Sequence, residues 1–86
     1  MIVSGSLESN DCLITLTPAQ TFGVRLESVV YAAYGKHIEH LIEAECHKHH
    51  LTTLAVHCQD QGALDVTIRA RLHEAFAKYK EAHPHA

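Results

Sequence analysis

Apolar and polar residues alternate along several short segments of the chain, which is the pattern of strands that bury one face. The clearest run is residues 22–29, in which apolar side chains alternate with charged ones. Residues 51–58 alternate in the same way, and residues 11–16 are rich in the aliphatic and β-branched side chains that favour strands. Residues 2–7 precede a turn and can pair with residues 11–16 as a hairpin. We therefore predict four strands.

Two other segments have the period of an amphipathic helix. A regular set of apolar residues shares one face of a helix predicted over about residues 35–49. A second helical pattern runs from Leu64 to Tyr79, with Asp65 at its start, where a carboxylate favours a helix N-terminus. Alternation at the beginning of this segment also permits a strand, but the long pattern that follows favours a helix.

The order of the predicted elements is strand, strand, strand, helix, strand, helix. This order predicts a small single α+β domain, with an antiparallel or mixed sheet of about four strands and two helices packed on one face. We assign the domain to residues 1–80, and we expect residues 81–86 to form a frayed C-terminal tail.

Residues 8–11 are typical of a tight turn between the first two strands. Asn10 tolerates the left-handed backbone conformation, and the side chains of Ser9 and Asp11 can bond to neighbouring backbone groups. We therefore expect Ser9 at a hairpin tip, with Glu8 and Asp11 beside it. A serine in a turn is usually unremarkable, but a hydroxyl at a tip is accessible to a modifying enzyme.

Charge and composition exclude several classes of function. The formal net charge of -3 disfavours binding to nucleic acid, which requires a clustered excess of Lys and Arg. The sequence shows neither a secretory leader nor an apolar run of membrane length, so we expect no membrane association and a cytoplasmic location. Three cysteines without close spacing suit a reducing compartment. No Gly-x-Ser-x-Gly signature supports a hydrolase.

Nine histidines suggest a metal site, but their spacing does not support one. The residues that such a site could draw on are His37, His40, Cys46, His47, His49, His50 and His57. His37 and His40 share a helical face, yet the chain has no Cys-x-x-Cys and no His-Glu-x-x-His motif. The residues 47–50 lie at a helix end, where protonated histidines complement the helix dipole. We predict no metal site.

Arg69 and Arg71 have two interpretations. They could bind a phosphate group, or they could form ordinary surface ion pairs. Asp65 and Arg69 have the spacing of an i,i+4 helix pair, which favours the second interpretation.

Three motifs together resemble the acyl carrier (gamma) subunit of citrate lyase. They are residues 5–11 (GSLESND), 60–65 (DQGALD) and 69–72 (RARL). The resemblance extends from about Gly5 to Tyr79 and departs from the family pattern at Asn10, where the family has glycine. It implies that Ser9 bears phosphoribosyl-dephospho-CoA through a phosphodiester, and that the terminal thiol of this group holds acetyl and then citryl as a thioester.

The resemblance also implies partners and a division of labour. An alpha-type acyl transferase subunit would exchange acetyl for citryl, and a beta-type citryl lyase subunit would cleave citryl to oxaloacetate. A prosthetic-group transferase would modify Ser9, and the chain itself would hold no catalytic residue. Three alternatives stay open: the related delta subunit of malonate decarboxylase, a His-rich metal-binding module, and a small domain that only mediates assembly.

Overall fold

The computed structural model describes residues 1–84 and contains four strands and two helices. In chain order these are β1 (Ile2–Gly5), β2 (Cys12–Pro18), β3 (Gly23–Ser28), α1 (Tyr31–Lys48), β4 (Leu54–Asp60) and α2 (Asp65–Ala82). The type and order of every element match the prediction, and the ambiguous segment after Leu64 is a helix. The α+β class is confirmed.

The boundaries differ from the prediction at β4, which covers Leu54–Asp60 rather than residues 51–58, and most at α1, which begins at Tyr31 rather than near residue 35. Its first turn carries exposed Tyr31 and Tyr34, so apolar periodicity does not reveal it. The Ser28 hydroxyl supports this start locally, since it accepts a hydrogen bond from the Val30 N–H at 3.1 Å. A hydroxyl acceptor at this position satisfies a backbone donor that has no partner within the helix.

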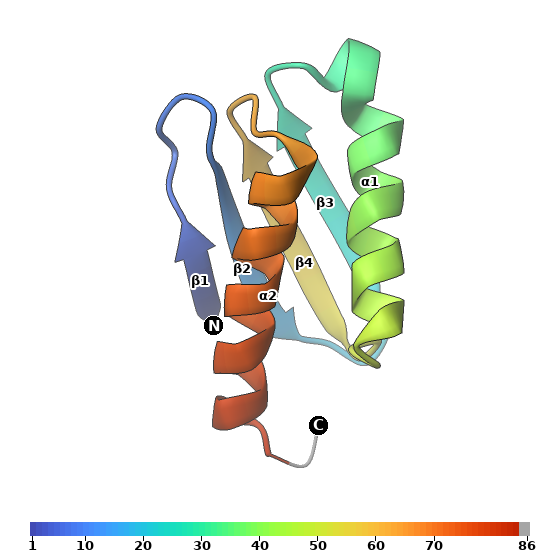
Figure 1. Cartoon of the computed structure of the whole chain (residues 1–86). Coiled ribbons are helices and arrows are strands. Elements are labelled where there is room, and N and C mark those ends of the chain that lie inside the picture. Colours follow the sequence, from blue (N-terminus) through green and yellow to red (C-terminus); the bar gives the residue numbers. More distant parts are fainter. Residues whose placement is uncertain (85–86) are drawn as a thin grey trace.

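The four strands form one mixed sheet in the order β1-β2-β4-β3. Strand β2 is antiparallel to both β1 and β4, whereas β3 and β4 are parallel and are joined through α1. Figure 1 shows that the β1–β2 loop, the β3–α1 turn and the β4–α2 loop consequently lie at the same end of the sheet. We call this the tip end.

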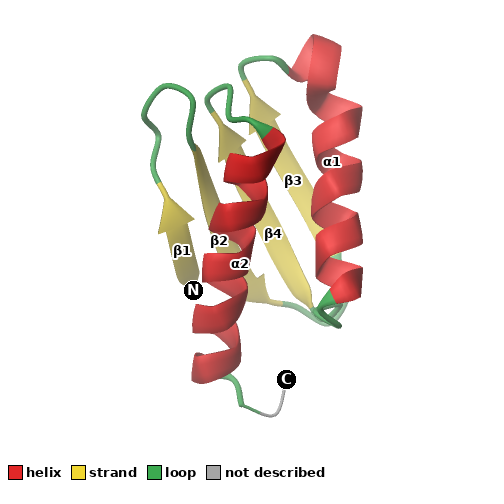
Figure 2. Ribbon diagram, viewed as in Figure 1, coloured by secondary structure: helices red, strands yellow, loops and turns green. Residues whose placement is uncertain are grey.

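Both helices cover the same face of the sheet (Figure 2). The burial pattern of β4 explains the layer, because Leu54, Val56, Cys58 and Asp60 are buried while the residues between them are only partly so. Alternate side chains of β2 and one face of each helix complete a single core. Its fully enclosed members include Ile14, Leu16, Ile42, Ile68 and Leu72.

Helix α2 continues past the predicted end of the domain. It reaches Ala82, and the His83 N–H donates to the Tyr79 carbonyl at 2.9 Å. The division at residue 80 stays a prediction, and the predicted tail 81–86 includes residues 85–86, which lie outside the described residues. Neither helix in the described part of the chain is long and apolar enough to cross a membrane.

Candidate functional site

Ser9 lies in the loop between β1 and β2 and is exposed at the tip end. The chain has four serines, all within the described residues, and they differ in what their hydroxyls do. Ser4, Ser6 and Ser28 each donate the hydroxyl to a carboxylate, at 3.0, 2.7 and 2.7 Å. The Ser9 hydroxyl has no hydrogen-bond partner among residues 1–84. Ser9 is therefore the serine whose oxygen is both accessible and uncommitted.

Two residues in unusual backbone conformations shape the loop that carries Ser9. Asn10 has a φ of 65°, so the left-handed conformation expected for it is confirmed. Gly5 has a φ of 97°, and a Cβ there would lie 1.9 Å from the Cys12 carbonyl oxygen. Only glycine fits this position, because any side chain would clash with fixed backbone. The loop geometry thus depends on the first and sixth residues of the first motif.

Asp11 anchors the loop to helix α2. Arg71 donates to its two carboxylate oxygens, from Nε at 3.0 Å and from Nη2 at 2.8 Å. The Ser6 hydroxyl and the Cys12 N–H, both at 2.7 Å, complete the set of donors. The bonds from Arg71, and next that from Ser6, hold the pKa of Asp11 well below its usual range. The carboxylate therefore stays ionised and the bidentate pair persists at neutral pH.

This pair favours the ion-pair interpretation for Arg71. Arg71 is engaged by Asp11, 60 residues earlier in the chain, and so it positions the loop. The predicted helix pair of Asp65 with Arg69 is wrong, since Asp65 instead meets His37 on α1, with Nε2 and Oδ2 2.6 Å apart. Sequence spacing favoured the local partner, but the packing of α1 beside α2 brings a distant histidine within reach.

The second motif forms the β4–α2 loop, and a buried carboxylate organises it. Asp60 is 1% exposed and accepts hydrogen bonds from the Ser28 hydroxyl at 2.7 Å, the Gly62 N–H at 3.2 Å and the Ala63 N–H at 2.9 Å. Gly62 adopts a φ of 87°, which glycine supplies without strain. Asp60 thus fixes this loop from inside the fold and links it to the end of β3.

The two loops are joined directly. The Asn10 N–H donates to the Gln61 carbonyl at 2.8 Å, and the Gln61 N–H donates to the Asp11 carbonyl at 2.9 Å. The motifs 5–11 and 60–65 are therefore neighbours in space, and Arg71 of the third motif holds the first in place. The three segments that carry the resemblance form one structural unit around Ser9.

Apolar side chains are exposed around this unit. An open cavity of about 400 Å³ lies between the start of α1 and the β4–α2 loop, and Tyr34, Ile38 and Leu64 contribute to its lining. Large exposed apolar residues at the tip end, on the three loops and the first turns of both helices, are Leu7, Val29, Tyr31, Tyr34, Leu64 and Val66. A partner protein can bury such a surface.

All three cysteines are buried and unpaired. They pack in the core as small apolar residues. Burial raises the pKa of the Cys46 thiol to about 12. The bond to Cys12, and then burial, also raises the pKa of Cys58. The thiols of Cys46 and Cys58 are therefore protonated at neutral pH, whereas the bond with Cys58 lowers the pKa of Cys12, which is fully buried.

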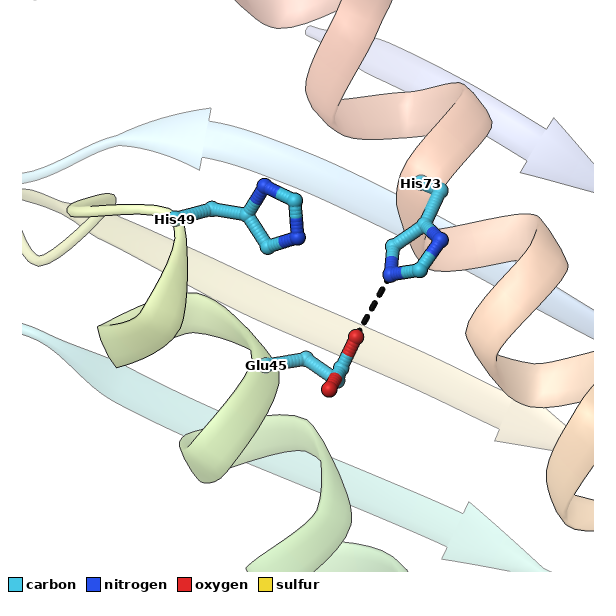
Figure 3. A group of neighbouring side chains, drawn as sticks. All are labelled: Glu45, His49 and His73. Atoms are coloured by element: carbon cyan, nitrogen blue, oxygen red, sulfur yellow. Dashed lines mark hydrogen bonds and ion pairs between the residues drawn. The ribbon is translucent and has the colours of Figure 1, made fainter.

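Away from the tip end, the last turn of α1 and the middle of α2 bring together Glu45, His49 and His73 (Figure 3). One oxygen or nitrogen atom from each lies within 4.8 Å of the others. His49 belonged to the histidines considered from the sequence, whereas Glu45 and His73 did not. His73 is on a different helix, so spacing along the chain could not reveal this set.

Comparisons with known proteins show the family to which the chain is similar. Residues 1–79 match the family model described as malonate decarboxylase delta subunit (MdcD). Citrate lyase acyl carrier protein of Streptococcus pyogenes serotype M5 (strain Manfredo) is 44% identical over 71 residues, 80% of this chain and 70% of that protein. The protein of the same name from Treponema denticola is 32% identical over 79 residues, 92% of this chain and 91% of that protein.

A solved structure shares the fold. It is the crystal structure of a Pseudomonas malonate decarboxylase hetero-tetramer in complex with malonate, one chain of which superposes with a TM-score of 0.72 at 23% identity. The match covers 88% of this chain and 79% of that chain.

Proposed function

We propose that Ser9 is the residue to which the prosthetic group is attached. The proposal starts from the family of citrate lyase acyl carrier proteins and malonate decarboxylase delta subunits, to which this chain belongs. The group that fits the family resemblance is phosphoribosyl-dephospho-CoA, joined to Ser9 through a phosphodiester. When bound, it supplies the thiol on which acetyl and citryl are held. The chain is thus an acyl carrier protein of the citrate lyase type.

One observation carries the assignment to Ser9. Its hydroxyl is exposed and free of internal hydrogen bonds, whereas the other three serines are each committed to a carboxylate. A transferase can use an exposed hydroxyl without breaking any bond of the fold. Modification of Ser4, Ser6 or Ser28 would instead remove a hydrogen-bond donor from a carboxylate, at a cost of about 0.5–1.5 kcal/mol or more each.

The residues around Ser9 give the attachment point a rigid base. Asp11 and Arg71 fix one side of the loop to α2, and Gln61 fixes the other side to the neighbouring loop. A rigid base with a long flexible arm keeps the thiol at high effective concentration for two partner active sites in turn. The carrier therefore needs no catalytic residue of its own, and we propose that it is a non-catalytic subunit.

The exposed apolar surface at the tip end supports docking of partner proteins there. We propose three of them: an alpha-type acyl transferase subunit, a beta-type citryl lyase subunit, and the transferase that attaches the group. Each must approach Ser9, and so each would meet Leu7 and Leu64, which are 53% and 70% exposed. Three unpaired cysteines support the cytoplasm as the location of this complex.

A second candidate is the carrier of a malonate decarboxylase. The description of the matching family and the fold of the Pseudomonas chain favour it, whereas the names of the relatives at 32–44% identity favour citrate lyase. Both candidates use the same serine, and so they differ in partner rather than in site. We give preference to citrate lyase, because the sequence likeness is stronger there.

Reconstitution tests both the site and the partner. The chain, loaded by a prosthetic-group transferase, is mixed with citrate lyase alpha and beta subunits, and oxaloacetate release from citrate is followed. We expect activity with the native chain and with Ser6→Ala, and none with Ser9→Ala. Activity with malonate decarboxylase partners alone would transfer the proposal to the second candidate. Activity with Ser9→Ala would refute the site in either system.

A further inference from the structure

We propose that Glu45, His49 and His73 form a binding site for a divalent transition-metal ion of the zinc class, which would join α1 to α2. This inference is independent of Ser9 and of the carrier function. The site lies between the C-terminal end of α1 and the middle of α2, whereas Ser9 is at the tip end, where both helices begin (Figures 1 and 3). It also departs from the sequence-based expectation that the histidines form no metal site.

The chemistry of the donors fits zinc. Two imidazoles and one carboxylate are a common set of three protein ligands for this ion, with water in the fourth position. His73 is exposed and His49 is half-buried, so the fourth position is open to solvent. The set contains no thiol from the three buried cysteines, and therefore a bound ion would have only nitrogen and oxygen ligands.

Binding of a zinc ion by these three residues requires only small movements of their side chains. Zinc bonds of about 2.0–2.2 Å in a tetrahedron place donor atoms about 3.4 Å apart. The donor atoms here lie within 4.8 Å of one another, and the closest pair, His73 Nε2 and Glu45 Oε1, is separated by 2.5 Å. A metal ion would take the place of the proton between those two atoms. Rotations of the exposed His73 side chain and the half-buried His49 side chain can supply the remaining adjustment.

The hydrogen-bonded pair Glu45 and His73 supplies two of the donors, and the neighbouring ring of His49 supplies the third. Its ring centroid lies 5.0 Å from that of His73 and 5.1 Å from that of Phe76. No hydrogen bond to either ring nitrogen of His49 is formed among residues 1–84. A ring nitrogen of His49 is therefore available as a ligand beside the other two residues.

The charges around the three donors determine the affinity expected for Zn²⁺. Glu45 is 5% exposed, and a cation beside it would compensate a carboxylate removed from water. Lys48 opposes this, since its Nζ lies 3.4 Å from Glu45 Oε2, and Lys80 also acts on His49. With three ligands and two nearby ammonium groups, we expect micromolar rather than nanomolar affinity for Zn²⁺.

The test uses the full chain without a polyhistidine tag, because a tag would bind the same ions. Zn²⁺ is titrated by calorimetry, and Co²⁺ is added separately because its visible absorption reports tetrahedral coordination. The variants are His73→Ala and His49→Ala, with His40→Ala as the matched control on the exposed part of α1. Circular dichroism checks that each variant folds. His73 is exposed, so its variant should keep the native structure.

The expected result is one Zn²⁺ per chain, with binding weakened at least about tenfold in His73→Ala and in His49→Ala and unchanged in His40→Ala. Native protein should show visible Co²⁺ bands without the near-ultraviolet band of a cobalt–thiolate bond. Absence of binding by the native chain would overturn the proposal. Binding that survives in both variants, or that involves a thiolate, would overturn it as well.

Discussion

The buried carboxylate of Asp60 should contribute more to stability than any other acidic side chain near Ser9. Asp60→Ala removes the acceptor of three hydrogen bonds, from the Ser28 hydroxyl and from the Gly62 and Ala63 N–H groups. Each buried donor left without a partner costs about 1–3 kcal/mol. The two N–H groups lie in a loop that water can reach after truncation, so we take the lower part of that range. The expected loss is about 2–4 kcal/mol.

Urea unfolding measures this loss, provided that the transition is two-state with an unchanged slope. In a domain of this size, about 3 kcal/mol should lower Tm by more than about 10 °C. Asp65→Ala is the matched control, because Asp65 has a single partner and a side chain that is 42% exposed. Its cost should stay below about 1 kcal/mol. Equal and small effects of the two substitutions would show that Asp60 does not organise the loop.

Three further predictions concern the loop and the thiols. Asn10→Gly should leave stability unchanged within about 0.5 kcal/mol, whereas Asn10→Val should lower it by about 1–2 kcal/mol in urea unfolding, because φ is 65°. The pKa of Asp11 is lower in the folded chain, so its contribution to stability is present above the unfolded pKa of about 3.9 and is lost as pH falls below it. Between pH 6 and pH 2, the free energy of unfolding should therefore fall less in Asp11→Asn than in the native chain. An equal fall in both proteins would contradict the ion pair. A thiol reagent should titrate none of the three cysteines of the native unmodified chain and all three after denaturation, and a rapidly reacting cysteine in the native chain would contradict their burial.

The fold could be predicted from the sequence because its elements have simple periods. Alternation in β3 and β4 and helical spacing in α2 report which side of each element is buried, and burial decides the layers. The start of α1 was missed because Tyr31 and Tyr34 remain exposed there. Apolar patterning locates a helix only where the helix packs.

The local geometry around Ser9 was predicted in part. The turn around Ser9 follows from local chemistry, and the left-handed Asn10 was expected correctly. The Asp11–Arg71 pair joins residues 60 positions apart, and Glu45 and His73 are 28 positions apart on separate helices. Such contacts depend on the register of the sheet and the packing of the helices. A single sequence contains the partners but does not report their distance.

The most direct test of the central claim is the site of modification itself. The chain is co-expressed with a citrate lyase prosthetic-group transferase, and its intact mass and proteolytic peptides are measured. The predicted result is a gain of one phosphoribosyl-dephospho-CoA on the peptide that contains Ser9, with no gain in Ser9→Ala, whose stability should change by less than about 0.5 kcal/mol. A group found on Ser4, Ser6 or Ser28, or on the folded Ser9→Ala chain, would contradict the account.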